Sequence, residues 1–353
     1  MKIAITADPM IPVPPQLYGG IERIIDMLIR GLTERGHDVT LFAHSESAVA
    51  CRLVPYPAKG QGVADVLKNT LTVSRLLAGR YDPVHSFGRL AYLSLLLPTG
   101  LPKLMSYQRE PTFSQVRKAV RVARKGSLWF TGCSEYIAAQ IRPYAPSFAI
   151  PNGVPLETYT FTPRVAPDAP LVFLGRLEHI KGPHVAIEVA QRSGRSLIIA
   201  GNVPDDEASN VYFATRIQPH LDGKYIQYIG PVNDAEKNAL LGSAYAFLMP
   251  ILWNEPFGIV MAEALACGTP VIGFGRGAVP EVVQHGVNGF LASNPEDMAA
   301  AVSRAGQLSR KDCRLSMEQR FSDKSIVEQY EALYNRILKR HPTQFQPSHS
   351  VVG

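Results

Sequence analysis

Twelve short apolar runs, arranged as two series of six, constrain the fold of this chain more than any other feature. Most are bounded by Gly, Pro or polar residues and are separated by stretches with helical periodicity. Apolar strands that alternate with amphipathic helices are typical of parallel sheets covered on both faces. The sequence therefore predicts two consecutive doubly wound α/β domains with the candidate site in the cleft between them. The predicted strands are residues 2–6, 38–43, 83–87, 103–107, 128–133 and 148–150, then 171–174, 196–200, 226–229, 246–250, 270–274 and 289–292.

The seam between the two series is marked by proline. The chain has 353 residues, whereas one hydrophobic core usually stops growing at about 250–300 residues. Residues 156–169 form the expected seam, because four prolines in and around this stretch interrupt any regular element. The predicted division is an N-terminal domain over residues 1–157, a C-terminal domain over 158–318, an amphipathic C-terminal helix within 319–340 and a loose tail over 341–353.

Composition excludes several classes of protein. The net charge of +6 and the pI of about 9.1 favour anionic partners, but no run of five or six Lys and Arg indicates a nucleic-acid-binding tail. The four cysteines are too far apart for a CxxC motif. No secretion signal is visible, and the longest apolar run, residues 90–97, is too short to span a membrane. We therefore expect a cytoplasmic protein.

The segment from Glu255 to Glu263 is the first candidate site. It follows a predicted strand and opens a helix, and a helix N-terminus attracts anions. Pro256 and Gly258 shape the loop, so that the amides of Ile259 and Val260 would face a diphosphate. Both carboxylates can accept hydrogen bonds from sugar or ribose hydroxyls. Taken alone, such a pair is more often a solvated helix-cap charge.

Two further strand-to-helix loops have the same design. Arg176 and Lys181 are cations five residues apart that can clamp a leaving diphosphate, although isolated surface cations are usually solvated. Gly19 and Gly20, in the segment Leu17-Tyr18-Gly19-Gly20, give backbone access near the cleft or form a simple flexible turn.

Two patterns are discounted. The glycines of residues 273–277 lack the third glycine of a dinucleotide fingerprint at its proper spacing. Asp205-Asp206-Glu207 could suggest a metal site, but the chain has no Asp-x-Asp and no His-rich cluster. The sequence predicts neither a metal nor a cofactor.

Taken together, the motifs resemble those of the retaining glycosyltransferases of the large fourth sequence family, which have the two-domain GT-B fold. The matching stretches are residues 18–23, 36–39, 151–154, 175–176, 181–182, 255–258, 263–270 and 320–322. The resemblance implies that Glu255 holds the donor sugar, that Glu263 holds the ribose, and that Arg176 and Lys181 stabilise the diphosphate. It also implies that the last helix crosses back to the N-terminal domain. The donor-binding residues it implies are Gly19, Gly20, Asn202, Val232, Phe257, Gly258, Ile259, Val260 and Glu263.

The chain departs from this family at one position on the acceptor side. Where many relatives have a His after the fourth strand, this chain has Gln108, which can form hydrogen bonds but cannot titrate. His85 matches another His-containing stretch, although a lone His at a strand end is more often structural. We expect His85, Gln108 and Arg109 on the acceptor side or near the donor sugar.

The resemblance implies transfer of a hexose from a nucleoside diphosphate sugar, UDP-glucose by subfamily likeness, to a glycan or lipid-linked acceptor. Cell-envelope polysaccharide or glycolipid biosynthesis is the expected setting. A nucleotide-sugar epimerase or phosphorylase of the same fold, and a non-catalytic nucleotide-sugar-binding partner, stay open. Cations between Arg109 and Lys125 form either a solvated face or one that contacts an anionic acceptor or the inner membrane surface. No nucleic-acid partner is expected.

Overall fold

A parallel sheet of seven strands forms the N-terminal half of the computed structural model, which describes residues 1–15, 19–79 and 81–340. Its strands are β1 (Lys2–Thr6), β2 (Asp38–Ala43), β3 (Arg52–Pro55), β4 (Val84–Ser86), β5 (Lys103–Tyr107), β6 (Leu128–Gly132) and β7 (Ser147–Ala149). They lie in the order β3-β2-β1-β4-β5-β6-β7, and all pairs are parallel. The strand order reverses direction beside β1, as in doubly wound folds.

A second parallel sheet of six strands follows. Its strands are β8 (Leu171–Leu174), β9 (Leu197–Ala200), β10 (Ile226–Tyr228), β11 (Ala246–Met249), β12 (Val271–Phe274) and β13 (Gly289–Ala292). Their order is β10-β9-β8-β11-β12-β13, which again reverses beside the first strand of the series. The prediction of two doubly wound α/β units is confirmed. The residue boundaries proposed for the domains stay a prediction.

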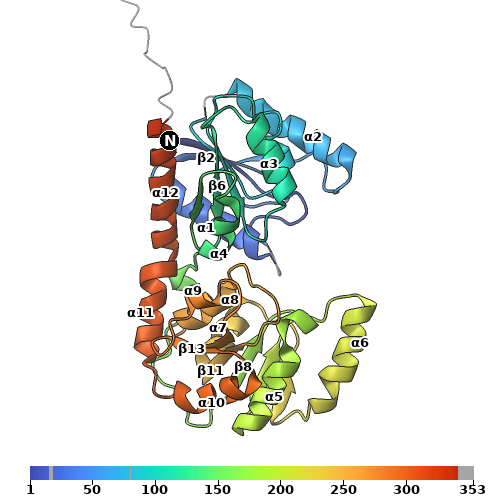
Figure 1. The fold of residues 1–353 in the computed structure, drawn as a ribbon, viewed down its shortest axis with the longest axis vertical. Coiled ribbons are helices and arrows are strands. Elements are labelled where there is room, and N and C mark those ends of the chain that lie inside the picture. Colours follow the sequence, from blue (N-terminus) through green and yellow to red (C-terminus); the bar gives the residue numbers. More distant parts are fainter. Residues whose placement is uncertain (16–18, 80, 341–353) are drawn as a thin grey trace, which may run out of the picture.

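Helices cover both faces of each sheet (Figure 1). Those of the N-terminal half are α1 (Gly20–Glu34), α2 (Val63–Ser74), η1 (Arg75–Ala78), η2 (Leu90–Leu93), α3 (Phe113–Val122), α4 (Glu135–Ile141) and η3 (Leu156–Thr158). Those that follow are η4 (His179–Lys181), α5 (Pro183–Ser193), α6 (Glu207–Arg216), η5 (Gln218–His220), α7 (Asp234–Ser243), α8 (Ile259–Ala266), α9 (Val279–Val282), α10 (Pro295–Ala305), α11 (Arg310–Phe321) and α12 (Asp323–Arg340). We call β1–β7 with α1–α4 the N-terminal lobe and β8–β13 with α5–α11 the C-terminal lobe.

Alternating side chains of the strands build two core layers per sheet. Ile3 and Ile5 of β1 belong to one buried cluster, and Ala4 between them belongs to another. In β8, Leu171 and Phe173 belong to a third cluster, whereas Val172 joins the cluster of Ala4. Because that cluster contains residues of both lobes, one continuous core connects the two sheets.

The C-terminal helix α12 packs on the N-terminal lobe, as the resemblance implied. Its buried residues, among them Ile326, Tyr330 and Ile337, share a cluster with α1, β1 and β2. Figure 1 shows α11 and α12 along one side of both lobes, with α12 beside the N-terminus of the chain. The predicted tail, 341–353, and Leu17 and Tyr18 of the glycine motif lie outside the described residues.

Candidate functional site

The loop between β11 and α8 holds Glu255 in a polar cluster. The Glu255 Oε2 atom accepts hydrogen bonds from Lys181 Nζ at 2.7 Å and from Trp253 Nε1 at 3.0 Å. The Lys181 ammonium also lies 4.7 Å from the centre of the Trp253 ring. Glu255 is buried, and its side chain and that of Lys181 are only 10% and 18% exposed. The structure therefore brings together two of the three predicted catalytic residues.

Two glycines make this cluster possible. Gly258, the N-cap of α8, has a φ of 75°, and a Cβ there would collide with Met261 and Met249. Gly182, at the end of the Lys181 loop, has a φ of 74° and lies against the carbonyl of Pro250. An L side chain would be strained at both positions. The two loops can therefore approach each other closely enough for Lys181 to reach Glu255.

Arg176 lies outside the cluster in this conformation. Its guanidinium forms an ion pair with Glu178 at 3.0 Å, and its side chain is 39% exposed. It still lies on the loop after β8 that carries Lys181. The spacing of Arg176 and Lys181 thus places both cations at one edge of the second sheet, although only Lys181 contacts Glu255.

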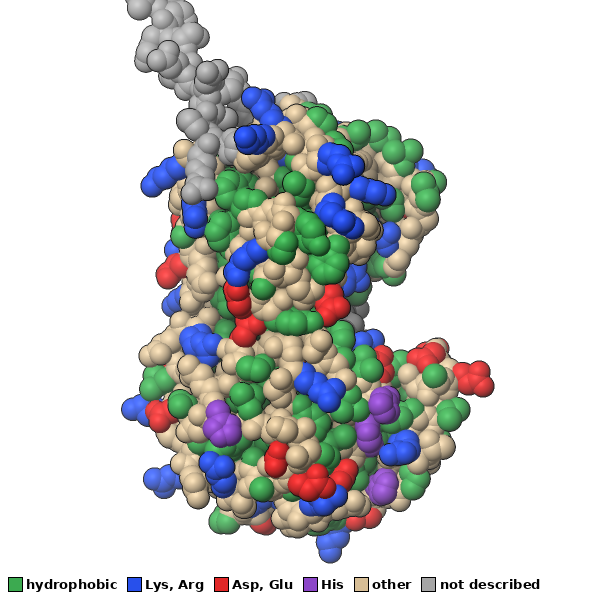
Figure 2. Space-filling view, viewed as in Figure 1, with side chains coloured by type: hydrophobic (Ala, Val, Ile, Leu, Met, Phe, Trp, Pro, Cys, Tyr) green, Lys and Arg blue, Asp and Glu red, His purple; other side chains and the backbone are tan. Residues whose placement is uncertain are grey.

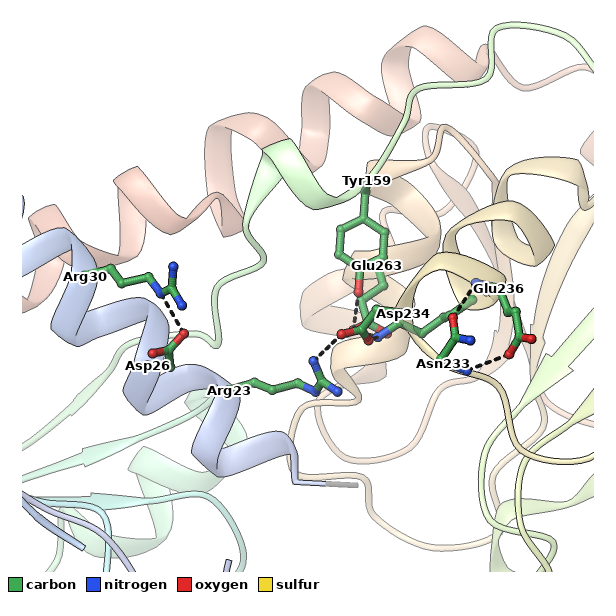
Figure 3. Close-up of polar contacts among 9 residues, drawn as sticks. Arg23, Asp26, Arg30, Tyr159, Asn233, Asp234, Glu236 and Glu263 are labelled. Carbon is green, nitrogen blue, oxygen red and sulfur yellow. Dashed lines mark hydrogen bonds and ion pairs between the residues drawn. The ribbon is translucent and has the colours of Figure 1, made fainter. Parts of the chain in front are cut away.

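Glu263, inside α8, belongs to a separate network (Figure 3). Its Oε1 atom accepts hydrogen bonds from Tyr159 Oη and from Lys237 Nζ, both at 2.7 Å. Burial and the nearby Glu263 carboxylate raise the pKa of the Tyr159 phenol, which favours its role as a donor. Lys237 also pairs with Asp234 at 3.3 Å, and Asp234 pairs with Arg23 of α1 at 2.6 Å. The network thereby joins both lobes through one chain of charges.

Asp234 carries a negative charge in this network. Burial alone would raise the pKa of its carboxyl group, but Lys237 and Arg23 outweigh that effect, and the pKa is lowered. Figure 3 shows Arg23, Asp26 and Arg30 along α1, with Arg23 reaching Asp234 at the start of α7.

A cavity of about 440 Å³ lies beside this network. Arg23 and Met27 of α1 line it on one side, and Glu263 and Ile259 of α8 line it on the other. Its wall takes in Glu263 but none of Arg176, Lys181 and Glu255. Glu263 therefore lines this cavity, whereas Glu255 lies in the separate cluster with Lys181 and Trp253.

The N-terminal lobe reaches the Glu255 loop through β5 and β6. The amide of Cys133 donates to the carbonyl of Tyr107 at 3.0 Å, and the Cys133 thiol contacts the carbonyl of Pro256 at 3.4 Å. Gln108 follows Tyr107 directly, at the carboxyl end of β5 and next to this contact. Its side-chain nitrogen Nε2 is shielded from solvent and has no hydrogen-bond partner within the part of the chain that the structure describes.

His85 does not reach the cleft. Its ring is completely buried, with Nδ1 2.6 Å from the Tyr334 hydroxyl of α12 and Nε2 2.6 Å from the Ser106 hydroxyl. Burial lowers the pKa of His85 to about 3, so the ring is neutral. A ligand in the cleft cannot contact this side chain, and the expected position beside the acceptor or the donor sugar is corrected to a structural one.

The remaining predicted residues have diverse surroundings. The ring of Phe257 packs into the core, 5.6 Å from the Phe321 ring, so only its backbone can face a ligand. Arg109 is exposed and acts electrostatically on Asp8. The pKa of Asp8 is raised because burial outweighs the effect of Arg89 and Arg109.

Gly19 is the N-cap residue of α1. Asn202 is exposed, and Val232 and Val260 are partly buried against the core shared by the lobes.

Ile259 links the N-termini of two helices. It packs against the core cluster shared by the lobes and also against the cluster that contains α1. Ile21, one residue into α1, packs against the latter cluster too. The glycine motif and the amides at the start of α8 therefore come from neighbouring helix ends, where anions are favoured.

Three contributors were missed by the sequence reasoning. Trp253 lies two residues before Glu255, and the presence of one of only two Trp residues beside the motif was an available signal. Tyr159 and Lys237 both contact Glu263, although they lie 104 and 26 residues from it along the chain. No spacing rule indicates either contact. Within residues 1–15, 19–79 and 81–340, no group of three or more His, Cys, Asp and Glu side chains could hold a metal ion.

Comparison with known families gives the class of protein. Residues 18–158 match the family description "Glycosyltransferase Family 4", and residues 163–324 match "Glycosyl transferases group 1". The two matches follow one another along the chain, one on each sheet, and together define a glycosyltransferase with the GT-B fold. The chain belongs to the glycosyltransferases of the family-four type.

Three similar proteins match this chain over nearly its whole length. YtcC of Bacillus subtilis, described as a presumed glycosyltransferase, is 24% identical over 98% of this chain and 95% of its own length. The structure of AviGT4, a glycosyltransferase involved in avilamycin A biosynthesis, is 25% identical with a TM-score of 0.69 and covers 96% of this chain and 98% of its own. HepE of Anabaena in complex with UDP-glucose has a TM-score of 0.72 at 20% identity, over 95% of this chain and 100% of its own. No helix among the described residues is long and apolar enough to cross a membrane.

Proposed function

We propose that this protein transfers a hexose from UDP-glucose, with retention of anomeric configuration and without a metal ion, to a glycan or lipid-linked acceptor. The setting would be cytoplasmic cell-envelope polysaccharide or glycolipid biosynthesis, with peripheral contact at the inner membrane surface. One observation carries the proposal: Glu255, buried in the loop before α8, is held there by Lys181 and Trp253.

In this proposal Glu255 accepts hydrogen bonds from hydroxyls of the donor sugar. Both of its protein partners bind Oε2, and a carboxylate has further acceptor capacity on its other oxygen. Lys181 and Arg176 stabilise the charge that develops on the leaving diphosphate, together with the amides of α8. Glu263 receives the ribose from the side of the cavity that it lines.

The acceptor side has no titratable group in the place of the family His. Gln108 can donate a hydrogen bond from Nε2, which has no partner among the described residues. The proton of the acceptor hydroxyl would then pass to the departing phosphate oxygen, so that no side chain has to serve as a base. Gln108 and Arg109 would orient the sugar and the acceptor rather than take part in proton transfer.

The choice of UDP-glucose rests on likeness alone. HepE of Anabaena, solved with UDP-glucose, shares the fold over its whole length. A thermal-shift screen with UDP-, GDP- and ADP-sugars in the presence of EDTA tests the donor and the independence of metal together. The largest rise in melting temperature is expected with a UDP-sugar.

Two substitutions test the proposed chemistry. We expect Glu255→Gln and Lys181→Ala each to lower kcat/KM for transfer about 100-fold or more, because each removes a charge that acts on the transition state. Transfer is measured as release of UDP in the presence of an acceptor. Glu296→Gln and Lys224→Ala are matched controls, because both side chains are exposed on the C-terminal lobe, away from the cluster.

The control variants should retain wild-type rates and melting temperatures. Glu255→Gln and Lys181→Ala should melt at a lower temperature, because each breaks a mostly buried ion pair, so their rates are measured below the melting transition. Wild-type rates in both Glu255→Gln and Lys181→Ala would disprove the proposal. Formation of a sugar epimer without acceptor would indicate an epimerase instead. Tight donor binding without turnover across an acceptor panel would indicate a non-catalytic binding protein.

A further inference from the structure

Three neighbouring strands of the seven-stranded sheet end in loops with polar side chains. In that sheet β1 pairs with β4, and β4 pairs with β5. The last residues to pair in these three strands are Thr6, Ser86 and Met105. Two residues beyond them come Asp8, Gly88 and Tyr107, which therefore lie beside one another at the carboxyl edge. Ligands of doubly wound sheets bind at this edge.

A close approach of two loops brings Arg89 to Asp8. A Cβ on Gly88 would lie 2.7 Å from the carbonyl oxygen of Ala7, so a larger residue would push the loops apart. The Arg89 Nε atom lies 3.8 Å from Asp8 Oδ1, which is an ion pair but too long for a hydrogen bond. Arg109 lies near enough to oppose the rise in the pKa of Asp8 that burial causes. Two guanidinium groups thus flank one carboxylate.

Shielded polar atoms of the same loops lack hydrogen-bond partners within the described part of the chain. They are the acceptor Asp8 Oδ1, the donor Gln108 Nε2 and the Tyr107 hydroxyl. An unpaired polar atom that is removed from water costs about 1–3 kcal/mol, so native proteins normally give it a partner. A donor and an acceptor together complement a hydroxyl group, which can accept from one and donate to the other.

The loop after β5 is joined to the loop that holds Glu255. The Tyr136 hydroxyl of α4 donates to Glu110 Oε1 at 2.5 Å, and Asn254 lies beside the same hydroxyl. Glu110 directly follows Arg109, and Asn254 directly precedes Glu255. Figure 2 shows a hollow between the two lobes on the side of α6, below the Lys and Arg side chains of the N-terminal lobe. A ligand of these loops would therefore lie near the carboxylate that the proposed function assigns to the donor sugar.

We propose that Asp8, Arg89, Gln108 and Arg109, which we call the Asp8 cluster, bind a uronic acid, and that this acidic sugar is the acceptor. Arg89 and Arg109 hold its carboxylate. Asp8 and Gln108 hold one of its hydroxyls and thereby orient a second hydroxyl toward the donor. The role as acceptor rests on the proposed transfer function, whereas the binding of an acidic sugar does not.

The second hydroxyl is the group that reacts. Its oxygen forms a bond to the anomeric carbon of the hexose, and the bond from that carbon to the diphosphate oxygen breaks. The proton of the hydroxyl passes to the departing UDP. Asp8 keeps its own hydrogen bond to the first hydroxyl during this step and takes up no proton.

The charges of the Asp8 cluster favour a carboxylate over a phosphate. A planar guanidinium group pairs with a carboxylate through two parallel hydrogen bonds. Two such groups beside Asp8 leave one net positive charge, which matches a monoanion, whereas a phosphate monoester carries about −1.5 to −2 charges at pH 7. Glu22 lies near Asp8 as well, but its buried carboxylate accepts from its own backbone amide at the positive end of α1, which offsets its charge.

Two other roles for the Asp8 cluster fit less well. A purely structural ion pair would leave Asp8 Oδ1 and Gln108 Nε2 without hydrogen bonds in the working protein. The diphosphate of the donor would bring at least two negative charges next to Asp8, and the proposed function already gives it Arg176 and Lys181. An acidic sugar satisfies the cations and the unpaired atoms together.

Binding to the full chain saturated with UDP tests the site without any transfer. Calorimetry should show methyl glucuronide to bind at least about ten-fold more tightly than methyl glucoside, because only the former offers a charged partner to the guanidinium groups. Arg89→Gln and Arg109→Gln should each weaken glucuronide binding about ten-fold and leave glucoside binding unchanged. Arg52→Gln is the matched control, since Arg52 is exposed and begins β3 at the opposite edge of the same sheet.

Asp8→Asn separates a positioning role from a structural one. Removal of the carboxylate leaves both guanidinium groups to the ligand, so the Kd for the glucuronide should stay equal or fall up to about five-fold. The kcat for transfer to the glucuronide should nevertheless fall about ten-fold, because the reacting hydroxyl is oriented less well. A merely structural Asp8 would weaken binding and lower kcat together. Asp38→Asn, at the exposed start of β2, is the matched control.

Several results would overturn the proposal. They are equal affinity of the wild type for glucuronide and glucoside, wild-type binding of the glucuronide in both arginine variants, and tighter binding of methyl glucoside 6-phosphate than of the glucuronide. Transfer to neutral sugars alone would uphold the proposed function and refute the acidic acceptor. Tight binding of the glucuronide without transfer from any nucleotide sugar would confirm the acidic-sugar site and refute the proposed function. Unchanged UDP binding shows that each variant is folded.

Discussion

Glu255 and Lys181 are opposite charges that both lose most of their contact with water. Removing one partner of such a pair leaves the other charge poorly solvated, which destabilises the protein beyond the loss of the contact itself. Trp253 still donates to Glu255 when Lys181 is absent. Activity measured on Lys181→Ala is therefore meaningful only beside a melting curve of the same variant.

His85 should make the N-terminal lobe sensitive to acid. Its pKa is about 3 in the folded protein because of burial, against 6.5 in the unfolded chain, so the unfolded state binds more protons between these values. Stability is complete above pH 6.5 and is lost as the pH falls toward 3, by up to about 1.4 kcal/mol per pH unit. Urea unfolding from pH 7 to pH 5, followed by tryptophan fluorescence, measures the loss.

The control for this prediction is His85→Gln, which can still form hydrogen bonds but does not titrate. Its stability should be lower than that of the wild type at pH 7, because the smaller side chain leaves part of the site unfilled. Between pH 7 and pH 5, however, it should lose less stability than the wild type. Equal losses in both proteins would show that His85 does not contribute.

Among the elements, helix α4 of the N-terminal lobe is bound to the C-terminal lobe through a carboxylate. Glu281 of α9 accepts hydrogen bonds from the first amides of α4, those of Glu135 and Tyr136, at 2.6 and 2.7 Å. An acidic group at a helix N-terminus is worth about 0.3–2 kcal/mol. We expect Glu281→Ala to lower the melting temperature by about 2–6 °C.

Glu188→Ala is the matched control for this contact. Glu188 pairs only with Arg192 of its own helix in the described structure, so its loss should change the melting temperature by less than about 1 °C. Small-angle scattering should also report a larger radius of gyration for Glu281→Ala. A melting temperature and radius equal to those of the wild type would contradict a role in holding the lobes together.

Most elements could be predicted because their apolar runs are buried on both faces. The exception is β3, which the sequence analysis omitted. Arg52–Pro55 is an edge strand with no fully buried residue and a Pro at its end, so it has neither the continuous apolar run nor the alternation that identifies strands. The stretch after Lys181 also predicts a helix from about His184 to Gln191, and α5 begins one residue earlier and ends two residues later, within the usual uncertainty of helix ends.

At the scale of the whole molecule, the Arg23–Asp234 pair connects α1 and α7 across the cleft. Both side chains are partly exposed, at 30% and 43%, so the pair is expected to contribute less than about 1 kcal/mol. Asp234→Arg should therefore raise KM for the donor by no more than about five-fold, with kcat little changed.

A charge exchange identifies the cause of that effect. Arg23→Asp combined with Asp234→Arg should restore KM to within about two-fold of the wild type, because the attraction between the lobes returns. If KM for the donor rises in the double variant as much as the two single variants together would give, the pair does not couple the lobes.

The candidate site was predictable only in part. The loops between strands and helices can be located from the sequence. All parallel strands of a sheet present their carboxyl ends at one edge, so the residues of these loops are expected to lie close together. Glu255 and Lys181 were placed together on this basis. The partners of Glu263 were not, because Tyr159 and Lys237 approach it through folding of distant segments. The expected position of His85 at the cleft was wrong because its burial depends on α12. Its partner in that helix, Tyr334, lies 249 residues further along the chain.

The return of α12 to the first lobe has a consequence for the order in which the protein can be made. A ribosome that has released residues 1–160 has supplied every strand of the seven-stranded sheet but none of the side chains of Ile326, Tyr330 and Ile337 that cover one of its faces. The part of that face that α12 covers, beside the part already covered by α1, stays open to water during synthesis of the entire second sheet. The nascent chain therefore carries an uncovered apolar layer for more than 150 residues of translation, which is a target for a ribosome-associated chaperone.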